Sequence, residues 1–339
     1  MMRITKHKSK QKFKLKIMIH FMIIFLFIPL FLQAEMGDER VGTSIFTFLK
    51  INPSARATSL GYASASLCDD ASIINSNPAG IIQLNGKAIS FSHLNYFADI
   101  DYDYTALAFP ISSNIGIGID AGVLHMKPME ITTEYKPYGS GEYFTFTDYF
   151  ISLAWSQRMS EHFSYGISGK YVNESYLDLK TESMLLTFGT YYLTGYKDLR
   201  IAVALKNFGT RANPDGTYEK TDLDGNISES NYQEFSPPTM FQLSSAMTTI
   251  DTKFIKLLTI FQLNHPVDNS EYYVIANELN LFKTLYLRVG YKMNYSDAPL
   301  SYGVGFSVQK WNKKISIDYA YYHHEYLMDV EQIQINFNF

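Results

Sequence analysis

The last eight residues of the chain, Gln332 to Phe339, read QIQINFNF. Isoleucine and phenylalanine occupy every second position, and the positions between them carry only glutamine and asparagine. Because the side chains of a β-strand point alternately to its two faces, this stretch predicts a strand with one apolar and one amide face. An amphipathic strand that ends the chain on phenylalanine favours a transmembrane β-barrel.

The same alternation recurs upstream in at least four segments: 115–120, 285–292, 301–308 and 315–321. Their polar faces carry mostly Gly and Ser with few charges, while Tyr and Phe lie on the apolar faces. A soluble sandwich also alternates, but its outer face is densely charged, whereas this chain is 18% charged and 15% aromatic. We therefore expect lipid on the apolar side and prefer an outer-membrane barrel to a secreted soluble β-protein.

The pattern predicts about fourteen antiparallel strands, an even number as single-chain bacterial barrels require. They are placed at 87–96, 102–110, 114–126, 143–157, 162–173, 179–193, 198–208, 237–247, 254–264, 270–279, 283–293, 299–310, 314–323 and 328–339. The two long connections, 127–142 and 209–236, alternate with short ones in a way that puts both long loops at the same end. Barrels of this kind have short periplasmic turns and longer outer loops.

Residues 1–34 have the features of a signal peptide: seven Lys and Arg residues, an apolar run over 17–32, and a small residue, Ala34. The alternative is a retained membrane anchor, but the apolar run contains His20 and Pro29 and is shorter than the roughly 20 residues that a spanning helix needs. Removing the seven positive charges changes the formal net charge from −4 to −11. An acidic mature protein argues against nucleic acid as a partner and is consistent with export to the bacterial outer membrane.

Between the leader and the first strand, Ala55 to Leu84 is rich in Ala, Ser and Gly. We expect residues 35–86 to form a plug inside a barrel made by residues 87–339. The turn of this plug is placed at Asn77, Pro78, Ala79 and Gly80, where Pro78 fixes φ and Gly80 permits a left-handed exit. A simple entry turn before the first strand is the alternative.

Three charged residues of this segment, Arg56, Asp69 and Asp70, would face a water-lined lumen. We expect them to pair with one another or with polar groups of the barrel wall such as Asp120, Lys170, Arg288 or Lys292. The single cysteine, Cys68, excludes an intramolecular disulfide and is more typical of a buried structural thiol than of a reactive one.

An ordered set of motifs resembles the PorV/PorQ family of outer-membrane proteins, itself similar to FadL-type transporters. The motifs are SIFTFLKINPSARATSLGYASASLCDDASIINSNPAGI (44–81), FSHLNYF (91–97), YGSGEYFTFTDYFISLAW (138–155), FSYGISGKYVNE (163–174), LRIAVALKNFGT (199–210) and YLRVGYKMNYSDAPL (286–300). The resemblance covers the chain from about Val41 to Phe339. It implies a fourteen-strand barrel with an N-terminal segment in the lumen, and the Asn-Pro-Ala turn of FadL-like proteins matches Asn77, Pro78 and Ala79.

The resemblance also implies two functions. PorV-like proteins act in type IX secretion, where they handle exported cargo together with secretion-system subunits. FadL-like proteins form channels for hydrophobic small molecules. The PorV-like motifs are closer, so cargo handling is the first hypothesis and the hydrophobic channel is the alternative.

The sequence contains no motif for a catalytic site, a metal site or a cofactor. The closest phosphate-loop match, GISGK at 166–170, lies inside a strand and lacks the required spacing. The histidines after the leader have no Ser or Asp partner that their spacing suggests, so we expect a protein that is not an enzyme. In the outer loop, Asp215, Asp222, Asp224, Asn226 and Glu229 are candidates for contact with a partner, with loose divalent binding as an alternative.

Overall fold

The computed structural model describes residues 40–339, except 178, 222–226, 296–297, 312 and 325–326. The expected signal peptide, residues 1–34, lies outside the described residues. Gly37–Phe339 forms one compact unit, and the description below concerns this unit. None of the helices that the structure describes combines the length and apolar character needed to cross a membrane.

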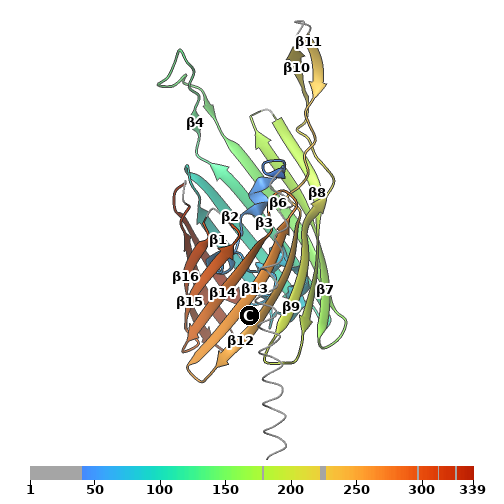
Figure 1. Cartoon of the computed structure of the whole chain (residues 1–339), viewed down its shortest axis with the longest axis vertical. Coiled ribbons are helices and arrows are strands. Elements are labelled where there is room, and N and C mark those ends of the chain that lie inside the picture. Colours follow the sequence, from blue (N-terminus) through green and yellow to red (C-terminus); the bar gives the residue numbers. More distant parts are fainter. Residues whose placement is uncertain (1–39, 178, 222–226, 296–297, 312, 325–326) are drawn as a thin grey trace, which may run out of the picture. The chain divides into compact units, whose positions relative to one another are not determined.

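Fourteen antiparallel strands form a closed barrel in the described part of the chain, which confirms the predicted fold class (Figure 1). Each strand pairs with its sequence neighbours in the barrel, and β1 closes the ring by pairing with β18. The strands are β1 (Ala88–Asn95), β2 (Ile100–Pro110), β3 (Ile115–Met126), β6 (Phe146–Arg158), β7 (Phe163–Tyr176), β8 (Leu179–Leu193), β9 (Arg200–Gly209), β12 (Met240–Asp251), β13 (Ile255–Pro266), β14 (Tyr272–Leu281), β15 (Leu285–Met293), β16 (Leu300–Lys310), β17 (Lys313–Tyr322) and β18 (Val330–Asn338).

The wall of the barrel is apolar outside and polar inside. In β18, Ile333 and Ile335 are 47% and 36% exposed, whereas the amide side chains of Gln332, Gln334 and Asn336 are buried. A soluble protein would show the opposite arrangement, because its apolar side chains would face the interior. The outward apolar face identifies the fold as a transmembrane barrel.

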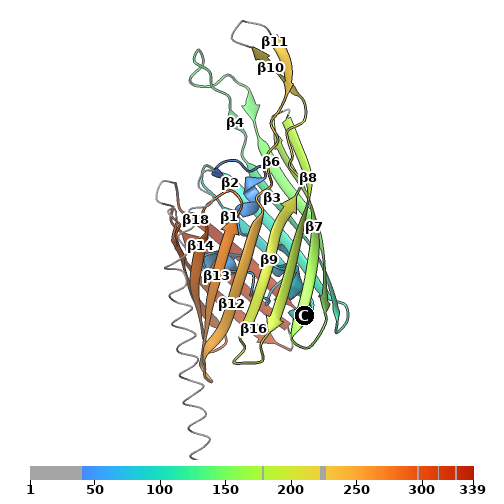
Figure 2. The same cartoon turned by 45° about the vertical axis from the view of Figure 1, so that its right-hand side comes forward.

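The two ends of the barrel differ in their connections. The end that contains the C-terminus has short turns and is called here the short-turn end. The opposite, long-loop end carries two small hairpins that extend beyond the wall: β4 (Met129–Glu130) with β5 (Tyr143–Phe144), and β10 (Thr217–Thr221) with β11 (Ile227–Asn231) (Figure 2). Outer-membrane barrels have longer loops on the extracellular side, so the long-loop end faces outward.

Residues 45–84, called here the inner segment, lie in the lumen. The segment contains η3 (Thr47–Lys50), α2 (Ala55–Ser59), α3 (Ile73–Ser76) and η4 (Pro78–Gln83), and most of its residues are buried. Helix α2 packs against β15 to β18, and η4 packs against β6, β7 and β8. Four short helical turns with small side chains can fit where a longer helix with bulky side chains could not.

Inward-facing glycines of the wall allow the inner segment to approach the strands closely. A Cβ atom at Gly290 in β15 would lie 2.2 Å from the Gly61 nitrogen and from the Leu60 carbonyl carbon. At Gly166 in β7, a Cβ atom would lie 2.6 Å from the Pro78 carbonyl carbon and the Ala79 nitrogen. Because these neighbours are backbone atoms, they cannot rotate away as a side chain would.

We expect the substitution Gly290→Ala to push the inner segment away from the wall and to cost about 1–3 kcal/mol through overpacking. The outward-facing substitution Gly169→Ala is the matched control, because its Cβ atom would meet only Leu186 Cδ2 at 4.0 Å. Limited proteolysis after Lys50 and Arg56 in detergent measures how well the segment is protected. Equal protection in both variants would show that the segment is not held by this contact.

Candidate functional site

The turn at residues 77–80 anchors the inner segment to the wall. Asn77 is fully buried and caps η4, because its Oδ1 accepts a hydrogen bond from the Ala79 amide at 3.1 Å. Its Nδ2 donates to the Ala65 carbonyl at 3.0 Å and to the Thr190 carbonyl in β8 at 3.1 Å. Because these bonds use both donors and the oxygen of its side chain, Asn77 positions the segment and has little hydrogen-bonding capacity left for a ligand.

The expected left-handed exit at Gly80 is wrong. Gly80 lies within η4 and is absent from the residues with positive φ in the described chain. Glycine is needed there for space instead, because a Cβ atom would lie 2.5 Å from Ile73 Cγ1. Local motif reasoning could not find this, since the contact depends on how α3 folds against η4.

Five charged side chains, called here the charged cluster, join the inner segment to the wall: Arg56, Asp69, Glu278, Arg288 and Asp318. Arg56 binds Glu278 with both nitrogens of one edge, Nε to Oε2 at 2.7 Å and Nη2 to Oε1 at 2.8 Å. Its Nη1 donates to Asp69. Arg288 donates from Nε to Glu278 at 2.6 Å and from Nη1 to Asp318 at 2.7 Å.

The charged cluster is largely shielded from bulk water. Arg56, Glu278, Arg288 and Asp318 are all at most 8% exposed, and Asp69 keeps 43% of its side chain exposed to a cavity inside the barrel. Taking charges out of water costs several kcal/mol for each ion, so such groups persist only where partners and hydrogen bonds compensate. The bidentate bond of Arg56 gives both strong attraction and a fixed geometry.

The two neighbouring aspartates of the inner segment have opposite environments. Burial alone would raise the pKa of Asp69, but the positive charges of Arg56 and Arg200 outweigh it and lower that pKa. Burial raises the pKa of Asp70, which accepts hydrogen bonds from the Ser72 amide at 2.9 Å and from the Ser72 hydroxyl. Asp69 therefore remains an anion in the cluster, while Asp70 acts in the local backbone turn.

The wall residues that we expected to face the segment have different partners. Arg288 joins the cluster through Glu278 and Asp318, two residues that the sequence did not single out. Asp120 accepts from the Tyr104 hydroxyl at 3.0 Å and from Ser152, and Lys170 donates to Asn207 Oδ1 at 3.2 Å. The Lys292 ammonium lies 4.2 Å from the ring centre of Tyr62 and 4.7 Å from that of Tyr295.

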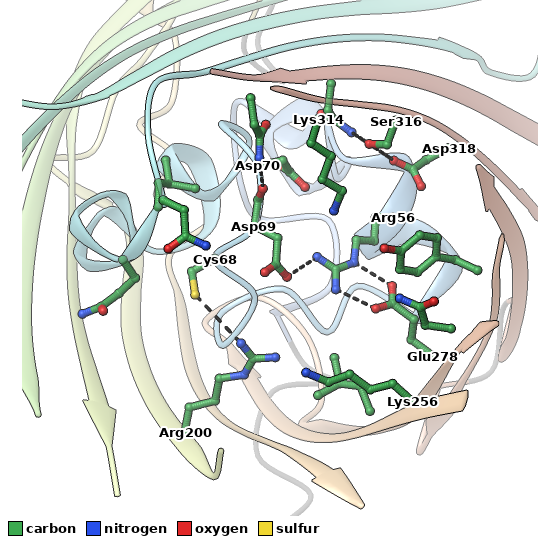
Figure 3. A pocket seen from close by; sticks show the side chains of 18 of the residues that line it. Arg56, Cys68, Asp69, Asp70, Arg200, Lys256, Glu278, Lys314, Ser316 and Asp318 are labelled. Carbon is green, nitrogen blue, oxygen red and sulfur yellow. Dashed lines mark hydrogen bonds and ion pairs between the residues drawn. The ribbon is translucent and has the colours of Figure 1, made fainter. Parts of the chain in front are cut away.

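A cavity of about 450 Å³, called here the vestibule, lies inside the barrel at the short-turn end (Figure 3). Its lining includes the charged cluster together with Cys68, Arg200, Lys256 and Lys314. Lys256 and Asp198 have side chains that are each 47% exposed, so the vestibule is in contact with solvent. This half of the lumen suits water and polar groups.

Toward the long-loop end, the lumen contains an apolar cluster, and the buried charged side chains Asp120 and Lys170 border it. Buried side chains of the inner segment, among them Phe46 and Phe48, pack there against the wall. The wall contributes Leu94, Tyr102, Tyr104, Leu124, Phe150, Val172, Leu185, Tyr322 and Val330 to this cluster. The rings of Phe48 and Phe150 have centroids 6.4 Å apart, within the range of favourable aromatic pairs. Porins, in contrast, have polar interiors.

A second recess, of about 400 Å³, lies on the outer face of the wall. It is lined by apolar side chains such as Phe91, Val123 and Ile335, and small Ala121 and Thr105 lie between them. Strands β18, β1, β2 and β3 pair without interruption along it. The recess is therefore a depression in the wall rather than an opening through it.

The histidines have acidic partners that their spacing in the sequence did not suggest. His93 Nδ1 lies 2.8 Å from Asp103 Oδ1, and His125 Nε2 lies 3.1 Å from Asp103 Oδ2. These three residues come from β1, β2 and β3, and cross-strand neighbours are not adjacent in sequence. Within the described residues, no group of three or more His, Cys, Asp or Glu side chains could hold a metal ion.

Of the loop residues proposed for partner contact, only two are described. Asp215 is exposed and its amide donates to the Lys180 carbonyl at 2.8 Å. Glu229 is exposed in β11, directly opposite Glu219 of β10. Asp222, Asp224 and Asn226 lie outside the described residues.

The chain was compared with protein families, curated sequences and solved structures. Residues 33–171 match the model of an uncharacterised protein family (UPF0164). No curated protein matches the chain in sequence.

Several solved structures have a similar fold. One is the toluene transporter TodX of Pseudomonas putida, with a TM-score of 0.58 and 10% identity over 84% of this chain and 96% of that one. Another is the toluene transporter TbuX of Ralstonia pickettii, with a TM-score of 0.56 and 10% identity over 86% of this chain and 99% of that one. The monoaromatic hydrocarbon channel CymD has a TM-score of 0.53 and 11% identity over 84% of this chain and 95% of its own. At this identity the likeness shows a shared barrel fold, and these neighbours are transporters and channels rather than enzymes.

We expect Arg56→Met to destabilise the inner segment by about 3–5 kcal/mol, because the substitution leaves Asp69 and part of the Glu278 charge without a partner. Urea unfolding of the purified protein in detergent measures this cost. Lys127→Met is the control, because Lys127 lies 3.7 Å from Asp99 with both side chains more than 70% exposed, and exposed pairs contribute at most about 1 kcal/mol. A loss as small as that of the control would mean that the cluster does not hold the segment.

Proposed function

We propose that this protein is an outer-membrane channel for small hydrophobic molecules and that the inner segment is its plug. The observation that carries the proposal is the apolar cluster that the wall and the inner segment form toward the long-loop end. A barrel that conducts water and polar solutes is lined by polar side chains. The inward-facing Leu94, Phe150 and Leu185 instead form an apolar surface of the kind that binds a hydrophobic solute. The fold shared with toluene transporters and a monoaromatic hydrocarbon channel supports the same substrate class.

In this conformation the protein's own aromatic rings occupy the apolar cluster. Phe46 is completely buried and Phe48 is 3% exposed. Phe46 has a φ of 58°, a left-handed conformation that is unfavourable for a bulky side chain. A strained aromatic residue of the inner segment therefore fills the space that a hydrophobic solute would take, and transport requires this part of the segment to move. The charged cluster, at the other end, holds the rest of the segment in place.

This assignment requires that the protein itself be exported to the outer membrane. The basic and apolar leader, residues 1–34, would direct the chain across the inner membrane, and the lipid-facing wall would then insert into the outer membrane.

We expect the double substitution Phe46→Ala with Phe48→Ala to increase toluene uptake several-fold, because it removes two rings from the apolar cluster. Cells that produce the protein are compared with vector-only cells for accumulation of labelled toluene. Phe91→Ala, on the outer face of the wall where Phe91 is 50% exposed, is the matched control. If neither the native protein nor the double variant raises uptake above the vector, the channel function is wrong.

A second candidate function is cargo handling in a type IX secretion system, as the PorV/PorQ resemblance implies. The two hairpins at the long-loop end favour it, because both extend beyond the wall (Figure 2). The loop between β4 and β5 also exposes Tyr135 and Tyr138 at 94% and 98%. Exposed tyrosines beside glycine and serine are common in surfaces that bind other proteins.

For this second function, we expect deletion of residues 209–236 to abolish co-purification of exported cargo or secretion-system subunits while toluene uptake is retained. Quantitative pull-downs from the native host measure the effect. Unchanged recovery of these proteins would exclude the β10–β11 hairpin as their binding surface.

A further inference from the structure

The vestibule is lined by three cations outside the charged cluster, which itself has two positive and three negative side chains. Arg56 and Arg288 are engaged with Asp69, Glu278 and Asp318, as described above. Three further cations, Arg200, Lys256 and Lys314, point into the same space from β9, β13 and β17 (Figure 3). The remaining acids of the lining are Asp70, which accepts from Ser72, and Asp198, which lies 4.0 Å from Lys256.

Arg200 has one buried donor without an acceptor. It is only 9% exposed, and its Nε is buried without a hydrogen-bond partner among the described residues. Its Nη1 has only a 4.0 Å contact with the Cys68 sulfur, a weak acceptor. A buried guanidinium with an unused donor carries a desolvation cost that an acceptor on a ligand would remove.

Lys314 is similarly available. Within the described part of the chain it has no ion pair within 4.0 Å, and its ammonium lies 5.6 Å from the Tyr286 ring centre. An arginine with an unused N–H donor and a nearby lysine commonly bind carboxylate and phosphate oxygens in proteins.

Two buried acceptors complete the site. Asn280 Oδ1 and Asn338 Oδ1 line the vestibule and have no hydrogen-bond partner among the described residues. They would suit hydroxyl or ammonium donors on the molecule whose anionic group binds Arg200.

We propose that the vestibule binds a small soluble anion that carries a phosphate or carboxylate group and also hydrogen-bond donors. Arg200 binds the anionic group, Lys314 supplies a second positive charge, and the asparagines accept from its donors. The ligand enters from the short-turn end, which faces the periplasm in this orientation. This site lies in the polar half of the lumen and does not depend on the hydrophobic channel function.

The single cysteine of the chain provides a direct test, because Cys68 lines the vestibule beside Arg200. An anionic methanethiosulfonate (sulfonatoethyl) and a cationic one (trimethylammonioethyl) are compared for their rates of reaction with the full-length protein in detergent at low salt. Burial raises the pKa of the Cys68 thiol, so the reactions are run at mildly alkaline pH. We expect the anionic reagent to react about tenfold faster relative to its rate with free thiol, equivalent to about 1.4 kcal/mol. A faster cationic reagent would overturn the proposal.

Ligand protection identifies the chemistry. sn-Glycerol 3-phosphate, which has both a phosphate and hydroxyl donors, should slow the reaction of Cys68 with iodoacetamide in a saturable manner. Lys314→Gln should weaken this protection at least tenfold, and the exposed Lys127→Gln should not change it. Arg200→Gln should abolish it, with circular dichroism and heat-modified gel mobility as checks that the barrel remains folded.

Three outcomes would contradict the proposal. The first is that neither sn-glycerol 3-phosphate, inorganic phosphate nor lactate protects Cys68. The second is protection that Lys314→Gln leaves unchanged. The third is protection by phosphatidylglycerol micelles alone, which would assign the site to a lipid headgroup. Toluene uptake is measured on the same Lys314→Gln variant and should be unchanged, so failure here is distinguishable from failure of the channel function.

Discussion

The bidentate bond between Arg56 and Glu278 is the interaction on which the interior depends. It joins the inner segment to β14, and through Glu278 it also orders Arg288 and Asp318 on β15 and β17. A barrel of this width would leave its lumen open if nothing filled it. The segment itself is made of short turns that could not persist alone, so its structure is imposed by the wall.

The lumen is consequently divided into two chemical environments. An apolar cluster lies toward the long-loop end, with a few buried charged side chains such as Lys170 at its border, and charged and amide groups surround a cavity toward the other end. A hydrophobic molecule and a small anion would meet complementary surfaces at opposite ends of the same interior. The inner segment contributes to both, with Phe46 and Phe48 in one half and Arg56 and Asp69 in the other.

The strands could be predicted from sequence because lipid and lumen impose opposite requirements on alternate residues, as QIQINFNF shows. The hairpins β4–β5 and β10–β11 could not, because both faces of these strands meet solvent and no alternation marks them. Side-chain partners on the barrel wall were also beyond reach. Glu278 is separated from Arg56 by more than two hundred residues, and Asp103 meets His93 and His125 only through strand pairing. A single charged residue that faces the lumen produces no periodic pattern in the sequence from which its partner could be predicted.

The closure of the barrel has a consequence for assembly. The inner segment leads directly into β1, and β1 pairs on its other side with β18, the last strand to be synthesised. Ala88 lies opposite Asn338, so the ring closes when the first and last strands of the barrel pair. The inner segment is therefore joined directly to the strand that closes the barrel. Pairing of β1 with β18 encloses the segment in the lumen.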